Sequence, residues 1–553
     1  MNESLTRKID LIRLYEDHKC LIVDDLPEMR GAIKRMVASQ GMARIDTAPN
    51  AVEAINQCSA RNYTIIICDY NLGQSQDGQQ LLETLRQRRL LRPTSLFVII
   101  TAETSREMVL GAIESQPDDY IAKPFTPKQF CRRLDRLMLK HQALLPIKKL
   151  FAEKRFKEAL AVCDEMIANN ARYAFEAERL RGRILFLLGE LHKAREHYEQ
   201  IIEQRPLPWA MLGLAETLVE LGADDQAEKI LLKVLEQDHR YVEAYDLLSR
   251  LYKSRNEFEQ AQRFTQLACE LSPKSAPRHR RLAELAELNG DTQTSLTSYK
   301  QAIRWAADSI YEDGSDHLNF ARKTAEQARL TGGKESREKG EQALRQLRKA
   351  KESYPNQPDI NLQAALVSAD VKLSCRMADA ADETEKARKL FATTEAKDTE
   401  SQLDYVRVLQ GAGEDDLAQQ HLQALAAEFA NNPEMMGRIE RLSSQPLSAG
   451  ARAEVAKLTK SGIAAYQNRD YTESCQIFKQ ALSMFPNHVG LNLNLVQVLL
   501  ERHDGLLDES DVTVINRCFD RIRNMADSDS QYERAQSLKA QFDNAERVQN
   551  RAS

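Results

Sequence analysis

Four short apolar runs in the first quarter of the chain each lead into an acidic, hydroxyl or basic side chain. The runs are Lys19 to Val23, Thr64 to Cys68, Leu96 to Ile100 and Asp119 to Ala122. Segments with helical periodicity separate them, so each run predicts a buried parallel strand. We therefore expect the chain to begin with an open α/β domain. Ligands of such sheets bind at the carboxyl ends of the strands.

Five polar residues fall at those strand ends, namely Asp24, Asp25, Asp69, Thr101 and Lys123. Three carboxylates held together repel one another, so the cluster implies either a bound cation or a protonated carboxyl group. Magnesium suits the predicted site because it prefers hard oxygen ligands and can bridge a carboxylate to a phosphoryl oxygen. The cluster therefore predicts a phosphate-accepting pocket that binds Mg2+.

Each residue of this pocket has an expected role. Asp69 follows the central strand and is the candidate nucleophile, which would become an aspartyl phosphate. Asp24, Asp25 and Asp69 are candidate metal ligands, as is the backbone carbonyl of Asn71. Two further residues can stabilise phosphoryl oxygens, Lys123 by its charge and Thr101 by a hydrogen bond.

The order of these residues resembles the receiver domain of bacterial two-component response regulators, over roughly residues 18–141. Asp24 and Asp25 follow the first strand, Asp69 the third, Thr101 the fourth, and Lys123-Pro124-Phe125 the fifth. The resemblance implies a flavodoxin-like, five-stranded parallel sheet and phosphorylation of Asp69 by a histidine kinase. It also implies a cis peptide bond before Pro124, since proline is the residue before which a cis bond is accessible.

The same resemblance assigns roles to three more residues. Tyr120 is expected to be the aromatic switch that turns inward when Thr101 moves toward the phosphoryl group. Asn71 and Glu103 occupy the positions that tune phosphate hydrolysis, and the pair is typical of regulators with a short-lived phosphate. The chain departs from the family in the loop from Tyr70 to Asp77, which is one residue longer and lacks the usual proline.

The remaining three quarters of the chain predict helices alone, with a repeating pattern. A small residue recurs at spacings of 35, 33, 34 and 34, at Ala159, Ala194, Ala227, Ala261 and Ser295. Mostly hydrophobic residues follow them after four and seven positions, with Thr265 as the polar exception, which places these residues on one helix face. This period and the closing prolines Pro206 and Pro273 resemble the tetratricopeptide repeat, whose stacked helix pairs form a curved solenoid.

These patterns divide the chain into five expected segments. They are an N-terminal extension (1–17), the receiver domain (18–141), TPR-like repeats (142–309), an irregular helical region with divergent repeats (310–454), and a C-terminal TPR-like unit with capping helices (455–553). The fold class is thus a flavodoxin-like receiver followed by an all-α solenoid. A solenoid suggests a protein partner, because its concave wall suits a peptide.

Composition excludes several function classes. No stretch approaches the roughly 20 apolar residues of a membrane span, and the charged amino end shows no signal peptide. Nine scattered cysteines without a Cys-x-x-Cys pair indicate reduced thiols and a cytoplasmic location. The net charge of -5 argues against nucleic acid as a partner. The basic cluster from Arg278 to Arg281 is interpreted as solvated surface.

No catalytic output motif is present, so we expect no enzyme activity beyond phosphoryl transfer to the receiver itself and its autodephosphorylation. The leading hypothesis is a response regulator that acts through protein binding by the repeats. Two alternatives remain open. The helical part could be an unrecognised enzyme or nucleic-acid-binding output, or the receiver could serve as a phosphate sink for the kinase.

Overall fold

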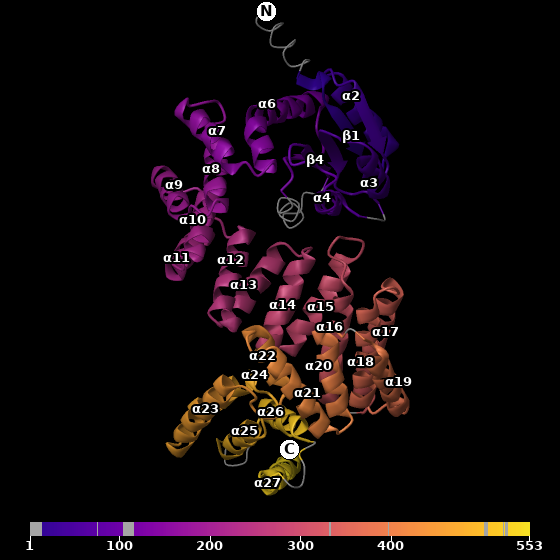
Figure 1. Cartoon of the computed structure of the whole chain (residues 1–553), viewed down its shortest axis with the longest axis vertical. Helices are drawn as coiled ribbons and strands as arrows, with labels where there is room; N and C mark the ends of the chain where they lie inside the picture. Colours follow the sequence, from indigo (N-terminus) through magenta and orange to yellow (C-terminus); the bar gives the residue numbers. More distant parts are fainter. Residues whose placement is uncertain are drawn as a thin grey trace, which may run out of the picture. The chain divides into compact units, whose positions relative to one another are not determined.

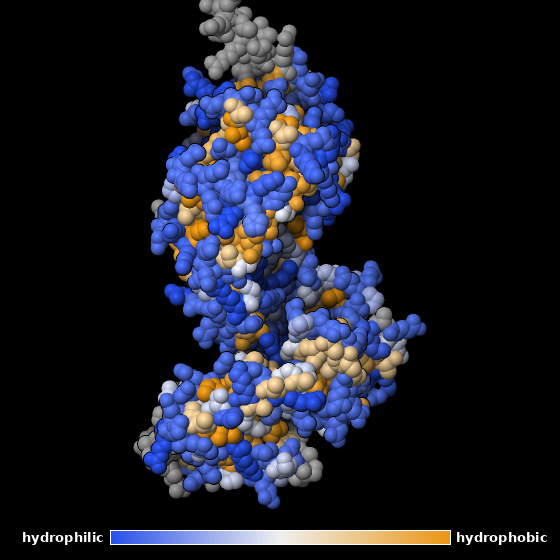
Figure 2. Space-filling view, turned by 60° about the vertical axis from the view of Figure 1, so that its left-hand side comes forward, coloured by the Kyte–Doolittle hydropathy of each residue, from blue (hydrophilic) through white to orange (hydrophobic). Residues whose placement is uncertain are grey.

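A computed structural model describes residues 14–73, 76–102, 116–330, 333–395, 397–502, 507–523, 525 and 529–552 (Figure 1). The chain forms two compact units. The first comprises Met1–Leu285 and Gln301–Glu312, and the second comprises Ala286–Lys300 and Asp313–Ser553. Among the described residues, no helix combines the length and apolar character needed to cross a membrane. The face in Figure 2 is mainly hydrophilic, with separate apolar patches.

The first unit begins with a five-stranded parallel sheet of order β2-β1-β3-β4-β5. The strands are β1 (Lys19–Val23), β2 (Arg44–Ala48), β3 (Ile65–Asp69), β4 (Leu96–Thr101) and β5 (Asp119–Ala122). The helices described around it are α2 (Pro27–Ala38), α3 (Ala51–Ala60), α4 (Gly78–Gln87) and α6 (Pro127–Ala152). This is the predicted flavodoxin-like fold.

Alternate residues of each inner strand serve two cores, one on each face of the sheet. In β1, Cys20 and Ile22 join the core that includes Val37 of α2 and Phe130 of α6. Leu21 and Val23 join the other core, which α3 and α4 complete. Because both faces are buried, the strands read as continuous apolar runs. The sheet is thereby fixed in one register, which aligns its carboxyl ends.

Helix α6 connects the sheet to the repeats without a break. It begins at a capping box in which Thr126 and Gln129 bond to each other's backbone amides. Its later residues Leu144 and Ile147 pack with Ala159 of α7 (Phe156–Ala168). The join near Pro146, which lies inside the helix, is therefore helical and not a loop.

Paired helices follow as the repeat pattern predicts. They are α8 (Ala174–Leu187), α9 (Leu191–Gln204), α10 (Pro208–Glu220), α11 (Asp224–Gln237), α12 (Val242–Ser254), α13 (Phe258–Leu271), α14 (Ala276–Leu288) and α15 (Thr292–Ala306). The small residues that mark the register are all fully buried: Ala159, Ala194, Ala227, Ala261 and Ser295. Small side chains at these positions let neighbouring helices approach closely.

The basic cluster at the start of α14 is not solvated surface, so that interpretation was wrong. Arg278 and His279 are buried. Arg278 donates from Nη2 to Asp246 Oδ2 at 2.8 Å and from Nε to Asp246 Oδ1 at 3.2 Å. Arg281 binds the same carboxylate at 3.1 Å. Asp246 of the preceding repeat thus binds two of the guanidinium groups and compensates part of the buried charge.

The second unit is helical throughout its described residues. Its helices are α16 (Gly314–Leu330), α17 (Gly333–Ser353), α18 (Pro358–Ser374), α19 (Ala380–Thr393), α20 (Thr399–Gly411), α21 (Asp415–Glu428), α22 (Pro433–Leu442), α23 (Ala449–Gln467), α24 (Tyr471–Met484), α25 (Val489–Arg502), α26 (Glu509–Arg521) and α27 (Tyr532–Ala552). The predicted C-terminal repeat is α23 with α24, where the Phe478 ring packs against Gly462. Ser474 Oγ donates to Gly462 O at 2.9 Å.

A buried histidine in α6 makes the stability of the sheet domain depend on pH. Burial, with Lys148 nearby, lowers the pKa of His141 to about 4, against 6.5 for an ordinary histidine. The unfolded chain therefore binds the extra proton first, so the free energy of unfolding falls as pH drops from about 6.5 toward 4. We expect a loss on the order of 1 kcal/mol near pH 5, measured by urea unfolding.

The His141→Gln variant should lose this contribution to the pH dependence. His239, an exposed turn residue, offers a matched control, and His239→Gln should leave the profile unchanged. Parallel profiles for His141→Gln and the wild type would contradict the prediction.

Candidate functional site: an acidic cluster at the strand ends

The carboxyl ends of the strands bring the predicted polar residues to one edge of the sheet. In the parallel register, Val23 lies opposite Cys68, Asp69 opposite Ile100, and Thr101 opposite Ala122. Asp24 and Asp25 follow β1 directly, Asp69 and Thr101 are the last residues of β3 and β4, and Lys123 follows β5. Sheet topology alone thus assembles a site from residues a hundred positions apart.

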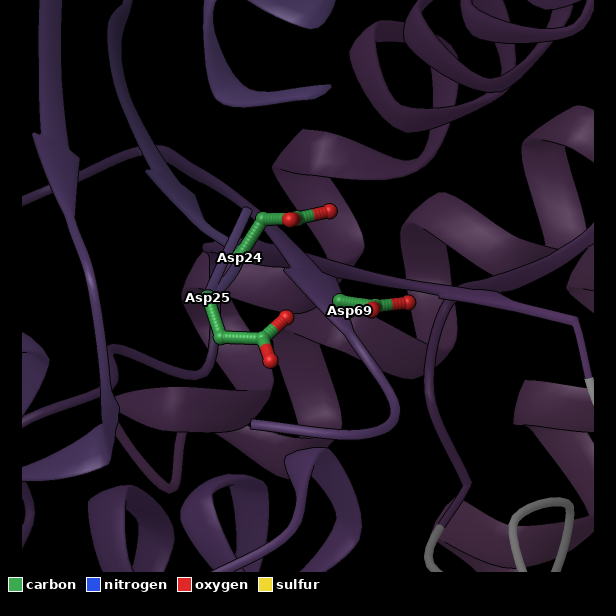
Figure 3. Close-up of side chains that lie close together, drawn as sticks. All are labelled: Asp24, Asp25 and Asp69. Atoms are coloured by element: carbon green, nitrogen blue, oxygen red, sulfur yellow. The ribbon is translucent and has the colours of Figure 1, made fainter. Parts of the chain in front are cut away.

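Three carboxylates meet at the centre of this edge. One oxygen from each of Asp24, Asp25 and Asp69 lies within 4.8 Å of the others. Figure 3 shows Asp24 and Asp69 extending in nearly the same direction, with Asp25 approaching from the adjoining turn. Asp24 is fully buried and Asp69 nearly so, whereas Asp25 is exposed. The cluster therefore has one side open to solvent.

Lys123 supplies a positive charge to the cluster. Its Nζ lies 3.0 Å from Asp69 Oδ1 and 3.5 Å from Asp24 Oδ2. Its peptide bond to Pro124 is cis, as the resemblance implied. Burial raises the pKa of Asp24 and of Asp69, and the Lys123 ammonium opposes both rises. One ammonium does not balance three carboxylates, so the site favours a further cation.

The donor set fits magnesium. All three side chains offer carboxylate oxygens, the ligands that Mg2+ prefers, and the exposed side of the cluster leaves room for its waters. Asp24 Oδ2 is buried and accepts no hydrogen bond from any described residue. Asp24 Oδ1, in contrast, accepts the Leu26 amide at 2.9 Å, which fixes the orientation of the side chain. The oriented Oδ2 atom has the Lys123 ammonium only at 3.5 Å, so it is not held by a short hydrogen bond and is available to a metal ion.

The other predicted residues surround the cluster. Thr101 is buried at the end of β4. Tyr120 lies in β5, partly buried against the core beneath α3 and α4. Asn71 is exposed two residues past Asp69, and its Oδ1 accepts the Gly73 amide at 3.2 Å. Glu103 lies outside the described residues.

Gly78 is a site residue that sequence reasoning missed. A Cβ at this position would lie 2.5 Å from the Asp69 carbonyl oxygen and 3.1 Å from Tyr70 Cα. The Gly78 amide donates to Tyr70 O at 2.7 Å, so the start of α4 rests directly on the backbone after Asp69. The sequence does offer one signal for this close contact. It is a glycine at the first position of the helix that follows the strand ending in Asp69.

We expect Gly78→Ala to destabilise the first unit by about 1–3 kcal/mol, because the methyl group must displace backbone. Urea unfolding measures this change. Gly31→Ala in α2 is the matched control, since its Cβ would meet only Arg35 Nη1, at 3.5 Å. Alanine there should be neutral or stabilising. Equal stability of the two variants would contradict the packing described above.

Comparison with protein families agrees with this geometry. Residues 20–135 match the response regulator receiver domain. Residues 185–251 and 242–275 match tetratricopeptide repeat families. The chain combines a response-regulator receiver domain with tetratricopeptide repeats. These matches cover the sheet with its acidic cluster and part of the paired helices that follow.

Several similar proteins are receiver domains. Chemotaxis protein CheY-3 of Vibrio cholerae is 29% identical over 22% of this chain and 94% of its own length. Chemotaxis protein CheY of Pseudomonas aeruginosa is 26% identical over 22% of this chain and 94% of its own. Among solved structures, a Francisella response regulator receiver domain is 27% identical over 22% of this chain and 98% of its own, with a TM-score of 0.21. The receiver is thus CheY-like.

Proposed function

We propose that a histidine kinase phosphorylates Asp69 of the receiver domain, and that the repeats bind a protein partner in a manner that depends on this phosphorylation. The observation that carries the proposal is the meeting of three carboxylates and Lys123 at the strand ends. The proposed receiver domain comprises residues 18–141, and residues 142–553 form the helical output.

Each side chain has a task in phosphoryl transfer. The buried Asp69 carboxylate attacks the phosphorus atom of the kinase's phosphohistidine; an O–P bond forms, the N–P bond breaks, and the histidine imidazole is the leaving group. Asp24, Asp25 and the Asn71 carbonyl hold Mg2+ beside it. When bound, Mg2+ neutralises negative charge on the transferred group. Lys123, now paired with Asp69, bonds instead to a phosphoryl oxygen.

Thr101 and Tyr120 transmit the change. The Thr101 hydroxyl donates to the phosphoryl group, and Tyr120 turns inward to occupy the space that Thr101 vacates. The phosphoryl group thus favours one of two arrangements of the sheet edge, as a population shift requires. Asn71 and Glu103 set the rate of hydrolysis and give the phosphate a short lifetime.

A hollow beside Lys123 supports a protein as the phosphoryl donor. It has a volume of about 650 Å³ and is lined mainly by apolar side chains, among them Met29, Met36 and Phe125, with Arg35, Ser39 and Lys123 as the polar members. An apolar surface of this kind suits a packed helix of the kinase better than it suits a small polar phosphodonor.

An exposed phenylalanine beside a partly buried tryptophan in the first repeats supports a protein as the output partner. Phe175 in α8 is 50% exposed, and its ring lies 5.7 Å from that of Trp209 in α10, edge to face. The Arg179 guanidinium lies over the Trp209 ring at 5.9 Å. Aromatic and arginine side chains are the types enriched at protein interfaces. The protein would act in the cytoplasm, where its nine free cysteines stay reduced.

Affinity capture from a lysate of the source cells tests the proposal. The baits are the wild-type chain and Asp69→Asn, each with and without acetyl phosphate and Mg2+. We expect one partner to be gained or lost by the wild type when the phosphodonor is added, and to be unaffected with Asp69→Asn. Identical capture under all four conditions would contradict phosphorylation-dependent output.

A further inference from the structure

A turn of the repeats contacts the phosphoacceptor loop of the receiver within the first unit. The turn lies between α13 and α14 and carries Lys274, whose Nζ donates to Tyr70 Oη at 2.9 Å and to Asp77 Oδ2 at 3.3 Å. The same ammonium lies 5.0 Å from the centre of the Tyr70 ring and 5.6 Å from that of Trp305. Lys274 therefore touches both ends of the loop from Tyr70 to Asp77.

The turn holds Lys274 in a fixed position. Buried Arg278 donates to Ser272 O at 3.1 Å, and His279 Nε2 lies 2.7 Å from Pro273 O, which can only accept a hydrogen bond. Arg278 is itself anchored to Asp246 of the preceding repeat. Because the backbone is ordered by these contacts, docking requires little further loss of conformational entropy. The basic cluster of α14 thus explains why this turn can serve as a binding element.

The receiver loop is restrained at the points that Lys274 contacts. Tyr70 follows Asp69, and its amide donates to Ile100 O at 2.7 Å. Asp77 caps α4 by accepting the Gln80 amide at 2.9 Å, while its other oxygen faces Lys274. Gln76 adds a second link, from its Nε2 to Asp308 O at 2.6 Å. A movement of this loop therefore changes the contact with the repeats.

The interface is polar and incompletely packed, as expected for one that opens. A cavity of about 680 Å³ lies along it, lined from both sides by charged residues that include Asp77, Glu83, Arg86, Lys274 and Arg304. Interfaces of this character between parts of one chain permit relative motion.

We propose that Lys274 is a clasp that holds the receiver loop against the repeats and opposes phosphorylation of Asp69. This inference rests on the proposed function. Lys274 bonds to Tyr70, the residue that follows Asp69, and to Asp77, so the clasp restrains the backbone beside the phosphoacceptor. Phosphorylation of Asp69 requires this backbone to move, so it must open the clasp. By linkage, opening the clasp must then favour phosphorylation.

The full-length chain offers a matched pair of variants. Arg240 lies 34 residues before Lys274, at the equivalent turn one repeat earlier. It is exposed, and the ion pair it makes is with Asp238 in its own turn. Lys274→Met and Arg240→Met therefore each remove one cation from equivalent turns, but only the first removes a contact with the receiver.

Two measurements test whether the Lys274 clasp exists in the unphosphorylated protein. The chain has two tryptophans, so Trp209→Phe leaves Trp305, beside Lys274, as the fluorescent reporter. Hydrogen exchange of the peptide from Tyr70 to Leu81 reads the loop directly. We expect Lys274→Met to change the emission of Trp305 and to speed exchange of the loop. Arg240→Met should match the parent chain, which carries Trp209→Phe alone. If the two variants showed the same Trp305 emission and the same loop exchange, the proposed clasp would be wrong.

A third measurement tests whether opening of the clasp and phosphorylation of Asp69 are coupled. With acetyl phosphate and Mg2+, we expect Lys274→Met to take up phosphoryl groups roughly fivefold to tenfold faster than Arg240→Met, because a larger fraction of its molecules is in the open, reactive arrangement. The parent chain should approach the emission of Lys274→Met once it is phosphorylated. If Lys274→Met opened the clasp but took up phosphoryl groups at the same rate as Arg240→Met, the proposed coupling would be wrong. Uptake by none of the variants would remove the proposed function and with it the coupling, while the resting comparison would still decide whether the clasp exists.

Discussion

Replacing Asp69 by asparagine should abolish incorporation of phosphoryl groups into the full-length protein. Asparagine keeps the size and hydrogen-bonding shape of the side chain, but its amide is not a nucleophile toward phosphorus. The fold should survive, because the substitution removes one of three crowded carboxylates and the Asp69 pKa is already raised by burial. Incorporation from acetyl phosphate, followed by mass spectrometry of the intact chain, measures the loss.

Asp46→Asn is the control for this variant. Asp46 lies in β2 of the same sheet, is 40% exposed, and binds Arg61 and Tyr63 instead of the acidic cluster. It should incorporate phosphoryl groups at the wild-type level. Residual incorporation in Asp69→Asn equal to that of Asp46→Asn would show that another residue accepts the phosphoryl group.

The second large effect is on stability, at a buried charge cluster of the second unit. Arg322 of α16 donates from Nε to Asp404 Oδ1 of α20 at 2.9 Å. Its Nη1 and Nη2 also bond to Asn319 and Gln363. The side chain of Asp404 is 1% exposed and that of Arg322 is 11% exposed. We expect Asp404→Ala to destabilise the second unit by about 3–5 kcal/mol, because it removes the buried carboxylate that both Arg322 and Arg407 bind.

A surface ion pair in the same unit provides the control. Glu341 and Arg345 lie 3.9 Å apart on α17, and both side chains are more than half exposed. Glu341→Ala should change stability by less than about 1 kcal/mol. Urea unfolding followed by circular dichroism compares the two variants. A small effect of Asp404→Ala, similar to that of Glu341→Ala, would show that the buried pair is not needed for the packing of α16 on α20.

The strands that sequence patterns predicted are those buried on both faces. Runs such as Leu96 to Ile100 are apolar throughout because helices cover both sides of the sheet. Strand β2 could not be located in the same way. Its sequence, Arg44–Ala48, is only partly buried at the edge of the sheet, and its polar and apolar residues neither form a continuous apolar run nor alternate regularly. A short edge strand of this composition is difficult to distinguish from a loop.

The repeat register was predictable because it depends on single small residues at fixed spacing. The burial of the charged cluster at Arg278 was not, because it depends on a partner in another repeat. Asp246 lies 32 residues away, and no local pattern indicates that the two meet. Ion pairing between helices is a property of the packed solenoid, so an isolated stretch of basic residues reads as surface.

The acidic cluster was predictable because topology brings all strand ends to one edge. The contact of Lys274 with Tyr70 was not, since it joins residues 204 positions apart and follows no motif. Asp24, Asp25 and Asp69 are brought together with Lys123 as expected, while their chemical roles stay predictions. The segment boundaries, and the tuning role of Glu103, stay predictions too.

The most direct measurement is to locate the phosphoryl group and test its dependence on metal. The wild-type chain is treated with acetyl phosphate in Mg2+ or in EDTA, digested, and mapped by mass spectrometry. We predict a single acyl phosphate on the peptide that contains Asp69, formed in Mg2+ and absent in EDTA. A modification on any other residue, or one that forms equally well without a divalent cation, would contradict the account.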